Sequence, residues 1–358
     1  MRILDKYIIK QFVLSFLFMF LLFIPIGILV DVSEKIDKFK EHDLSFYEVF
    51  NYYIDFIWYY GYFLFPIFVF LAVIWFTSKL SSNSEVIAIL SSGVSFKRYL
   101  QPFIVTAIFI AFISIFSGMF IIPEKNKSFT IFQNKYLSKK NKNNAFQAVY
   151  KQLSDNEYLY VSSYNKTRNQ AYNFSIEKFN GNKLQEKILA RNIRWIEKDS
   201  LFRLTDYFKR TFKDKSEKIE SKRIFDTIMN LTMSDFEIVN YQAKTLNFFE
   251  LNRFIESEKK SGSPLLNSHI LEKNKRITIP ISVIILTVLA VVVSSFKKRG
   301  GIGLNLAFGI TLAFIFVFFD KFFSVLVTES NLNPHIGAWL PNLIFAFVTA
   351  YIVKLSLK

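Results

Sequence analysis

The 358-residue chain contains no cysteine, and this absence limits the chemistry that the protein can perform. Without thiols there are no disulfide bonds, no thiolate ligands for a metal and no cysteine nucleophile. Histidine is almost as scarce: His42, His269 and His335 are far apart in sequence and form no metal-binding spacing. The sequence therefore predicts neither a metal centre nor a bound cofactor.

The common catalytic and nucleotide-binding motifs are also missing. No GxxxxGK[ST], GxSxG or HExxH pattern occurs, which excludes a P-loop and the best-known hydrolase and metalloprotease signatures. Gly300-Gly301-Ile302-Gly303 is glycine-rich but lacks a following Lys and Ser/Thr, and we interpret it as a tight turn between two helices. The net charge of +16 comes without a nucleic-acid-binding motif, so we expect neither an enzyme nor a nucleic-acid partner.

Long apolar segments are the dominant feature of what is present. Hydrophobic residues make up 51% of the chain, including 43 Phe, and they gather into blocks of at least about 18 residues, long enough to cross a bilayer as helices. The first block is too long for a signal peptide and has no small-residue cleavage site after it. The predicted spans are Phe12–Val30, Phe56–Thr77, Tyr99–Ile122, Ile277–Phe296, Gly303–Val327 and Ile336–Val353.

Charged residues near the spans predict their orientation. Segments 1–10, 79–98, 297–301 and 354–358 are strongly basic, whereas segments 31–55 and 328–335, on the opposite side, are mainly acidic. Because short cytoplasmic loops carry the excess of Lys and Arg, we expect both termini in the cytoplasm. The long polar segment between the third and fourth spans then lies outside the cytoplasm.

This long segment, residues 123–270, has the pattern of a β domain. Short alternating stretches beginning at Tyr158, Tyr172, Lys187 and Leu201 predict strands, and Asn180-Gly181-Asn182 predicts a turn. Such strands favour a β sandwich or jelly roll. A helix is expected to follow, with Asn247 and Glu250 as its capping pair and Gly262 as its stop.

The predicted fold class is therefore a membrane α-helical protein with six transmembrane helices and an inserted extracytoplasmic β-jelly-roll domain. Its expected divisions are residues 1–122 for the first three spans, 123–270 for the β domain and its helix, and 271–358 for the last three spans.

The loop between the second and third spans carries a short apolar helix. Ser82 and Glu85 fit a capping box, Gly93 fits a C-terminal stop, and the helix over 83–92 places Val86, Ile89 and Leu90 on one face. That face has two possible uses. It can pack on the spans of its own chain, or it can dock into a groove on a cytoplasmic partner.

At this loop the chain resembles the LptF/LptG permease family. Ser84-Glu85-Val-Ile-Ala-Ile-Leu-Ser-Ser-Gly93 is similar to the S-E-x-x-x-x-x-A-S-G segment of that family, and Ile3-Leu4-Asp5-Lys6-Tyr7-Ile8 is similar to the L-D-R-Y-I start of its LptG side. The end of the fourth span, Ser294 to Gly301, and the order of spans, β domain and spans are similar too. The resemblance covers the whole chain.

The resemblance implies the membrane subunit of an ABC-type exporter in the bacterial inner membrane. Such permeases pair as LptF and LptG on an LptB ATPase dimer, extract lipopolysaccharide and pass it, with LptC, along a periplasmic bridge. By this resemblance residues 83–92 form the coupling helix, Glu85 contacts the ATPase, and Val86, Ile89, Leu90 and Gly93 belong to the same contact. ATP hydrolysis is then expected on a partner chain.

Two groups of charged residues are candidates for contact with the lipid. Lys35, Lys38 and Lys40 follow the first span, where lipid phosphates would lie, and the alternative is a solvated loop of mixed charge. Asp320 and Lys321 lie in the fifth span, where charges are costly and should face a cavity or a partner. Lys321 could line the lipid access route or anchor the helix as an interfacial ion pair.

Two other functions fit six spans with an outer domain. An ion-coupled secondary transporter would need ionisable residues near the midplane, and only Asp320 and Lys321 qualify. A membrane-anchored periplasmic scaffold would need one span rather than six.

Overall fold

The structure, a computed structural model, describes residues 3–137, 149–165, 168–197, 200–213, 216–236, 242–295, 301–330 and 332–356. Gly300 and the basic run Lys297–Arg299 lie outside these ranges. The rest of the predicted Gly300–Gly303 turn is wrong, because Gly301, Ile302 and Gly303 form the first turn of a helix. The chain forms two compact units. One is helical, with Met1–Leu137, Ala243–Leu251 and Asn267–Lys358, and the other holds the β-sheet, with Ser138–Gln242 and Asn252–Leu266.

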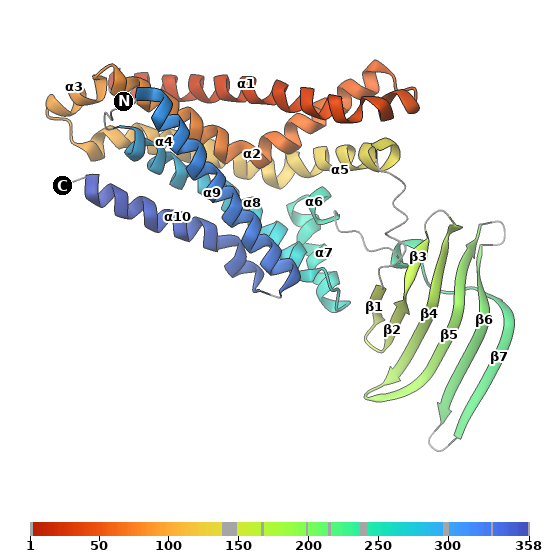
Figure 1. Ribbon diagram of the computed structural model, residues 1–358. Coiled ribbons are helices and arrows are strands. Elements are labelled where there is room, and N and C mark those ends of the chain that lie inside the picture. Colours follow the sequence, from red (N-terminus) through yellow and green to blue (C-terminus); the bar gives the residue numbers. More distant parts are fainter. Residues whose placement is uncertain are drawn as a thin grey trace. The chain divides into compact units, whose positions relative to one another are not determined.

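Six helices of the helical unit are long and apolar enough to cross a membrane, which confirms the six predicted spans (Figure 1). The third span is built from α4, α5 and two π-helical turns, η1 and η2. The helices of the unit are α1 (Ile3–Glu41), α2 (Phe46–Ser82), α3 (Glu85–Ser91), α4 (Phe96–Phe116), η1 (Ser117–Ile121), α5 (Ile122–Phe132), η2 (Gln133–Leu137), α6 (Gln242–Thr245), α8 (Leu266–Ser294), α9 (Gly301–Glu329) and α10 (Pro334–Ser356), with α7 (Phe248–Lys260) beginning in this unit and ending in the other.

The bundle has two distinct ends. Helix α3, the start of α1 and the end of α10 lie together at one end, which we call the α3 end (Figure 1). The chain leaves the opposite end through α5 and returns through α8, and we call this the α5 end. An even number of spans requires both chain termini to lie at the same end of the bundle.

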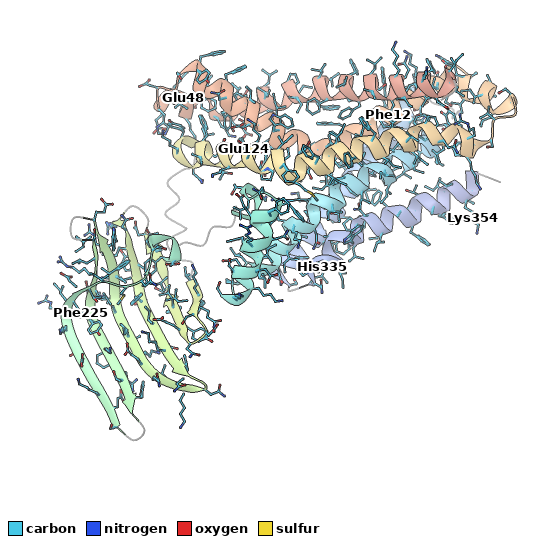
Figure 2. The ribbon with its side chains drawn as sticks, turned by 180° about the vertical axis from the view of Figure 1, so that it is seen from behind. Phe12, Glu48, Glu124, Phe225, His335 and Lys354 are labelled. Carbon is cyan, nitrogen blue, oxygen red and sulfur yellow. The ribbon has the colours of Figure 1, made fainter. Side chains whose placement is uncertain are left out.

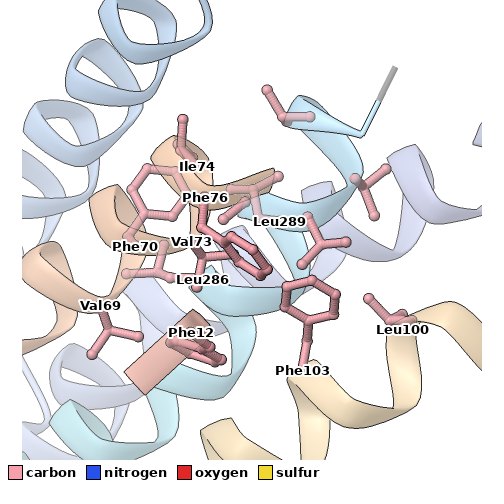
Figure 3. Close-up of a cluster of buried hydrophobic side chains, with 14 of the residues drawn as sticks. Phe12, Val69, Phe70, Val73, Ile74, Phe76, Leu100, Phe103, Leu286 and Leu289 are labelled. Atoms are coloured by element: carbon pink, nitrogen blue, oxygen red, sulfur yellow. The ribbon is translucent and has the colours of Figure 1, made fainter. Parts of the chain in front are cut away.

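Helices α2 and α8 form the packed centre of the bundle. In the most apolar window of each, 67% of the residues are buried, against 17% for α1 and 22% for α9. Figure 3 shows Phe12, Phe70 and Phe103 meeting Leu286 and Leu289 in this core. Phe12 and Phe103 lie 6.3 Å apart between ring centroids, so aromatic packing joins α1 to α4.

A capping box fixes the start of α2, and a separate hydrogen bond joins this start to the end of the third span. The Glu48 backbone N–H donates to Ser45 Oγ at 3.3 Å, and Ser45 N–H donates to Glu48 Oε2 at 3.0 Å. The Tyr136 hydroxyl of η2 also donates to Glu48 Oε1 at 3.3 Å. Figure 2 labels Glu48 near the start of α2.

The third span changes its winding at η1, where α2 approaches it closely. A Cβ on Gly118 would lie 2.2 Å from the Tyr62 hydroxyl, so only glycine fits beside this side chain. Pro123 follows and has no backbone N–H, which removes one donor from the helical ladder at this point. We infer that these two residues together produce the π-helical turn.

The second unit is built on one antiparallel sheet with strand order β1-β2-β4-β5-β6-β7, in which β3 pairs with β4. Phe174, Phe202 and Leu204 are buried on one face, beneath the turn η5 (Met233–Phe236), whose Phe236 is 1% exposed. The strands are β1 (Val149–Ser154), β2 (Glu157–Val161), β3 (Ser163–Asn165), β4 (Gln170–Asn180), β5 (Lys183–Ile196), β6 (Leu201–Lys213) and β7 (Ser216–Thr227).

The predicted insertion of an antiparallel β domain between the third and fourth spans is confirmed. The four predicted strand segments lie on β2, β4, β5 and β6, and the predicted turn joins β4 to β5 with Gly181 at φ +57°. The described strands form a single sheet in meander order, so the two-sheet closure of a jelly roll stays a prediction. The pairing of β4 with β5 shifts register between Lys178 and Phe179, where Lys178 pairs with Glu186 and Phe179 with Leu184, and such a bulge bends a sheet.

The predicted helix after the sheet is α7, and its capping pair is present. Glu250 N–H donates to Asn247 Oδ1 and Asn247 N–H donates to Glu250 Oε2, both at 2.9 Å. Gly262, with φ +64°, follows the end of the helix, as the stop signal predicts.

Candidate functional site

The α3 turn is formed by two sharp changes of direction between long helices. Helix α2 ends at Ser82, and Ser84 then adopts φ +63° before α3 begins at Glu85. After α3 the Gly93 N–H donates to the Leu90 carbonyl at 3.1 Å, and Gly93 has φ +87°. The predicted glycine stop is therefore confirmed, because a positive φ of this size favours glycine.

The predicted Ser82–Glu85 capping box is wrong. Ser82 belongs to the last turn of α2, and the residue that precedes α3 is Ser84, whose side chain makes no capping bond. The left-handed backbone at Ser84 replaces the extended conformation that a capping residue normally needs.

Glu85 is instead held by the start of α1 and by its own turn. Its Oε2 accepts a hydrogen bond from the Tyr7 hydroxyl at 3.3 Å, and its Oε1 accepts one from Asn83 Nδ2 at 3.2 Å. The carboxylate is half-buried, so one side of it stays open to solvent. It can therefore accept a further hydrogen bond from outside the chain.

The apolar face of α3 packs on the spans of its own chain. Val86 is 1% exposed, and Ile89 and Leu90 are partly buried against the same core that Figure 3 shows. The neighbouring Ile87 points away and is 49% exposed. Sequence reasoning missed Ile87, although a large apolar residue outside the Val86–Ile89–Leu90 stripe was the available signal.

An ion pair beside α3 joins α1 to α4. Arg98 Nη2 contacts both carboxylate oxygens of Asp5 at 2.8 and 2.7 Å, and Asp5 is 6% exposed. This charge-assisted contact links the two helices as well as compensating the buried charge of Asp5. The α3 turn is thus held by α1 on one side and by α4 on the other.

Two of the three lysines at the end of α1 bind groups of the same chain. Lys35 donates to Asp31 and, at 2.8 Å, to the Tyr52 hydroxyl, while Tyr52 also donates to Asp31 at 3.1 Å. Lys38 donates to the Leu137 carbonyl of η2, whereas Lys40 is exposed. The buried Asp31 was missed by sequence reasoning, because it reads as one acid among several in a polar loop.

Asp320 and Lys321 lie on α9, about 14 Å from its end at Glu329 by helical rise. Asp320 accepts from Lys275 of α8 at 2.7 Å, and it borders a small cavity together with Phe63 and Asn342. Lys321 places its ammonium 4.4 Å from the centroid of the Phe63 ring, which is cation–π distance.

The two predicted residues of α9 therefore have different surroundings. Asp320 is paired within the bundle, whereas the Lys321 side chain is exposed beyond its ring contact. Lys275 was missed as a partner because it lies in a basic run where the chain re-enters the spans. Across the described ranges, no group of three or more His, Asp or Glu residues could hold a metal ion.

Comparisons with known proteins agree with this architecture. A family model described as "Lipopolysaccharide export system permease LptF/LptG" matches residues 6–355, nearly the whole chain. A search of curated proteins finds no match.

Proposed function

Because the chain belongs to the LptF/LptG family of lipopolysaccharide export permeases, we propose that it is the transmembrane subunit of an ABC-type exporter. In this proposal it extracts lipopolysaccharide from the inner membrane and passes it to a periplasmic bridge. The observation that carries the proposal is the family match over residues 6–355, on a bundle of six membrane-spanning helices with a β-sheet unit inserted after the third.

The energy source in this proposal is a separate LptB-like ATPase dimer. Drawing a lipid with several acyl chains out of a bilayer costs about 0.8 kcal/mol for each CH₂ group that leaves the apolar phase, so the step needs an external source of energy. The ATPase would dock on the α3 turn, where Glu85, Ile87 and the open surface around Gly93 face outward. Val86, Ile89 and Leu90 then transmit the contact, because they pack α3 onto the spans.

The other partners follow from the same family. An LptF-like paralogous permease would complete the membrane part, and an LptC-like protein would receive the lipid from the β-sheet unit. The α3 end would face the cytoplasm and the sheet the periplasm, which is supported by the basic residues of segments 1–10 and 79–98.

Lys321 is our proposed contact for the anionic lipid, with Lys40 as a second exposed cation near the end of α1. Lys is well suited to phosphate as a compact charge. Asp320, Lys35 and Lys38 support the helices around these positions through the bonds given above.

Reconstitution tests the proposal directly. The chain, co-expressed with the paralogous permease and the ATPase, should purify as one complex and release lipopolysaccharide from proteoliposomes only when ATP is present. The Glu85→Ala variant serves as the control, since it should lose ATPase from the complex while its spans remain folded. Purification without an ATPase, together with substrate movement under an ion gradient, would refute the proposal.

A further inference from the structure

The first turn of α7 presents a large apolar side chain to the outside of the protein. Phe249 is 62% exposed, whereas Leu251 and Ile255 on the opposite side of the helix are 0% and 7% exposed. Glu250 and Arg253 flank Phe249 on the exposed side. Helix α7 is therefore amphipathic, with one aromatic residue on its polar side.

The position of this turn is fixed by the helical unit. Arg276 of α8 is 4% exposed and donates through Nη2 to the carbonyls of Ala243 at 2.9 Å and Leu246 at 2.7 Å. Asn126 of α5 donates to the Lys244 carbonyl at 3.2 Å. These bonds bind the segment before α7 to the α5 end of the bundle.

Phe249 continues a row of exposed apolar side chains on the third span. Its ring centroid lies 6.2 Å from that of Phe120, which lies 5.3 Å from that of Phe116. Phe116 and Phe120 are 55% and 39% exposed. The row has the i, i+3, i+4 spacing of one helix face and comprises Val105, Ile108, Phe109, Phe112, Phe116 and Phe120.

An exposed apolar row of this length suits contact between the third span and acyl chains. It extends over about 22 Å of helix and belongs to a helical segment that is long and apolar enough to cross a membrane. Glu124, Lys125 and Lys127 follow Phe120 within two turns, so Phe120 lies close to the boundary between acyl chains and head groups.

We propose that Phe249 inserts into the bilayer at this boundary and anchors the start of α7 to the lipid surface. The ligand is the acyl region of the surrounding phospholipid, because Phe249 extends an exposed apolar face of a membrane-spanning helix. Glu250 and Arg253 then lie among the head groups, the arrangement that interfacial amphipathic helices adopt. The turn through which the β-sheet unit rejoins the spans is thus fixed to the membrane as well as to α8.

The absence of native cysteine allows a direct test with single-cysteine variants. Phe249→Cys carries a fluorescent label, in the full-length chain in nanodiscs of phosphatidylcholine with brominated acyl chains. Phe116→Cys and Phe120→Cys report lipid contact, and Ser257→Cys, on the exposed side of α7 two turns further along, reports water. Quenching by the brominated lipid at position 249 should be closer to that at position 120 than to that at position 257.

Two results would overturn the proposal. Strong quenching by aqueous iodide and little by lipid at position 249 would place the residue in water. Protection from both quenchers, in the presence of the other subunits, would show that a protein covers it instead. Phe249→Trp, with the fluorescence of the wild-type chain subtracted, repeats the lipid measurement without a label and guards against a distortion caused by the probe.

Discussion

Neighbouring residues of α3 have opposite roles in the structure. Val86 is 1% exposed and belongs to the core of the bundle, whereas Ile87 is 49% exposed. A substitution at Val86 should therefore change the stability of the fold, and a substitution at Ile87 should change the affinity for a partner that binds this surface.

Ile87→Ala should weaken ATPase binding by roughly five- to thirtyfold, which corresponds to about 1–2 kcal/mol for one interface residue. The measurement is ATPase affinity for the permease pair in detergent or nanodiscs. Val86→Ala is the matched control, since it creates a cavity and should lower the unfolding temperature of the permease itself. Equal ATPase affinity for Ile87→Ala and the wild type would remove Ile87 from the docking surface.

Lys321→Glu should lower crosslinking to lipopolysaccharide, because it reverses the charge of an exposed cation on α9. The measurement is the yield from a photo-reactive residue placed at a nearby lipid-facing position. Lys35→Gln should leave that yield unchanged and lower thermal stability instead, since it leaves Asp31 buried without its cation. Normal crosslinking in Lys321→Glu would make this residue a helix anchor only.

At the scale of elements, the close approach of α2 to η1 depends on Gly118. Gly118→Ala should destabilise the protein by about 1–3 kcal/mol, because its Cβ would overlap the Tyr62 hydroxyl and ring. The penalty, measured as a change in unfolding temperature or denaturant midpoint, should shrink in a Tyr62→Leu background. An additive double variant would show that the contact with Tyr62 is not the cause.

The turn that covers the sheet depends on an ion pair. Lys151 of β1 donates to Asp235 at 2.6 Å, and Asp235 also accepts from the Thr232 N–H at 2.7 Å. Burial raises the pKa of Asp235, but these hydrogen bonds outweigh it and hold the pKa below its ordinary value of 3.8.

Acid should therefore loosen this turn. A carboxylate with a lowered folded-state pKa stabilises the fold above pH 3.8, and this stabilisation is lost as pH falls through the lower folded value. Hydrogen exchange of β1 should be faster in Asp235→Asn than in the wild type at neutral pH. The two proteins should converge in acid, and a constant difference at every pH would contradict the ion pair as the cause.

Local sequence signals predicted the elements with strong patterns and missed those without one. Strands β2, β4, β5 and β6 alternate apolar and polar residues, whereas β7 is exposed on both faces for most of its length and has no such alternation. Strand β3 has only three residues, too few for a periodic signal. The predicted capping box at Ser82 is wrong because α2 continues to Ser82. The length of α2 depends on its packing against other helices, which a four-residue motif does not contain.

At the scale of the whole molecule, the six spans and the inserted sheet could be predicted because block hydropathy is a strong signal. The surroundings of the candidate site could not. Lys35 with Tyr52, and Asp320 with Lys275, are pairs between different helices, separated in sequence by 17 and 45 positions. The partner of each charged group depends on how the helices pack, and a local sequence pattern contains no information about that packing.

The orientation of the molecule can be tested in the same cysteine-free background. Ser92→Cys, exposed at the end of α3, should react with an impermeant thiol reagent only when the cytoplasmic face is open. Ser221→Cys, exposed on β7, should react in cells with an intact inner membrane and a permeable outer one. Labelling of both positions from one side would overturn the proposed topology.

The unequal burial of the six spans has a consequence for how this sequence can change over time. Lipid tails accept any apolar shape, so the outer faces of α1 and α9 should drift freely among Leu, Ile, Val and Phe unless a protein covers them. Helices α2 and α8 have no such freedom, because neighbouring side chains fix the volume at each of their positions. A saturation mutagenesis scan should therefore show two intolerant helices flanked by permissive ones, and any intolerant stripe on α1 or α9 would mark the footprint of a binding partner.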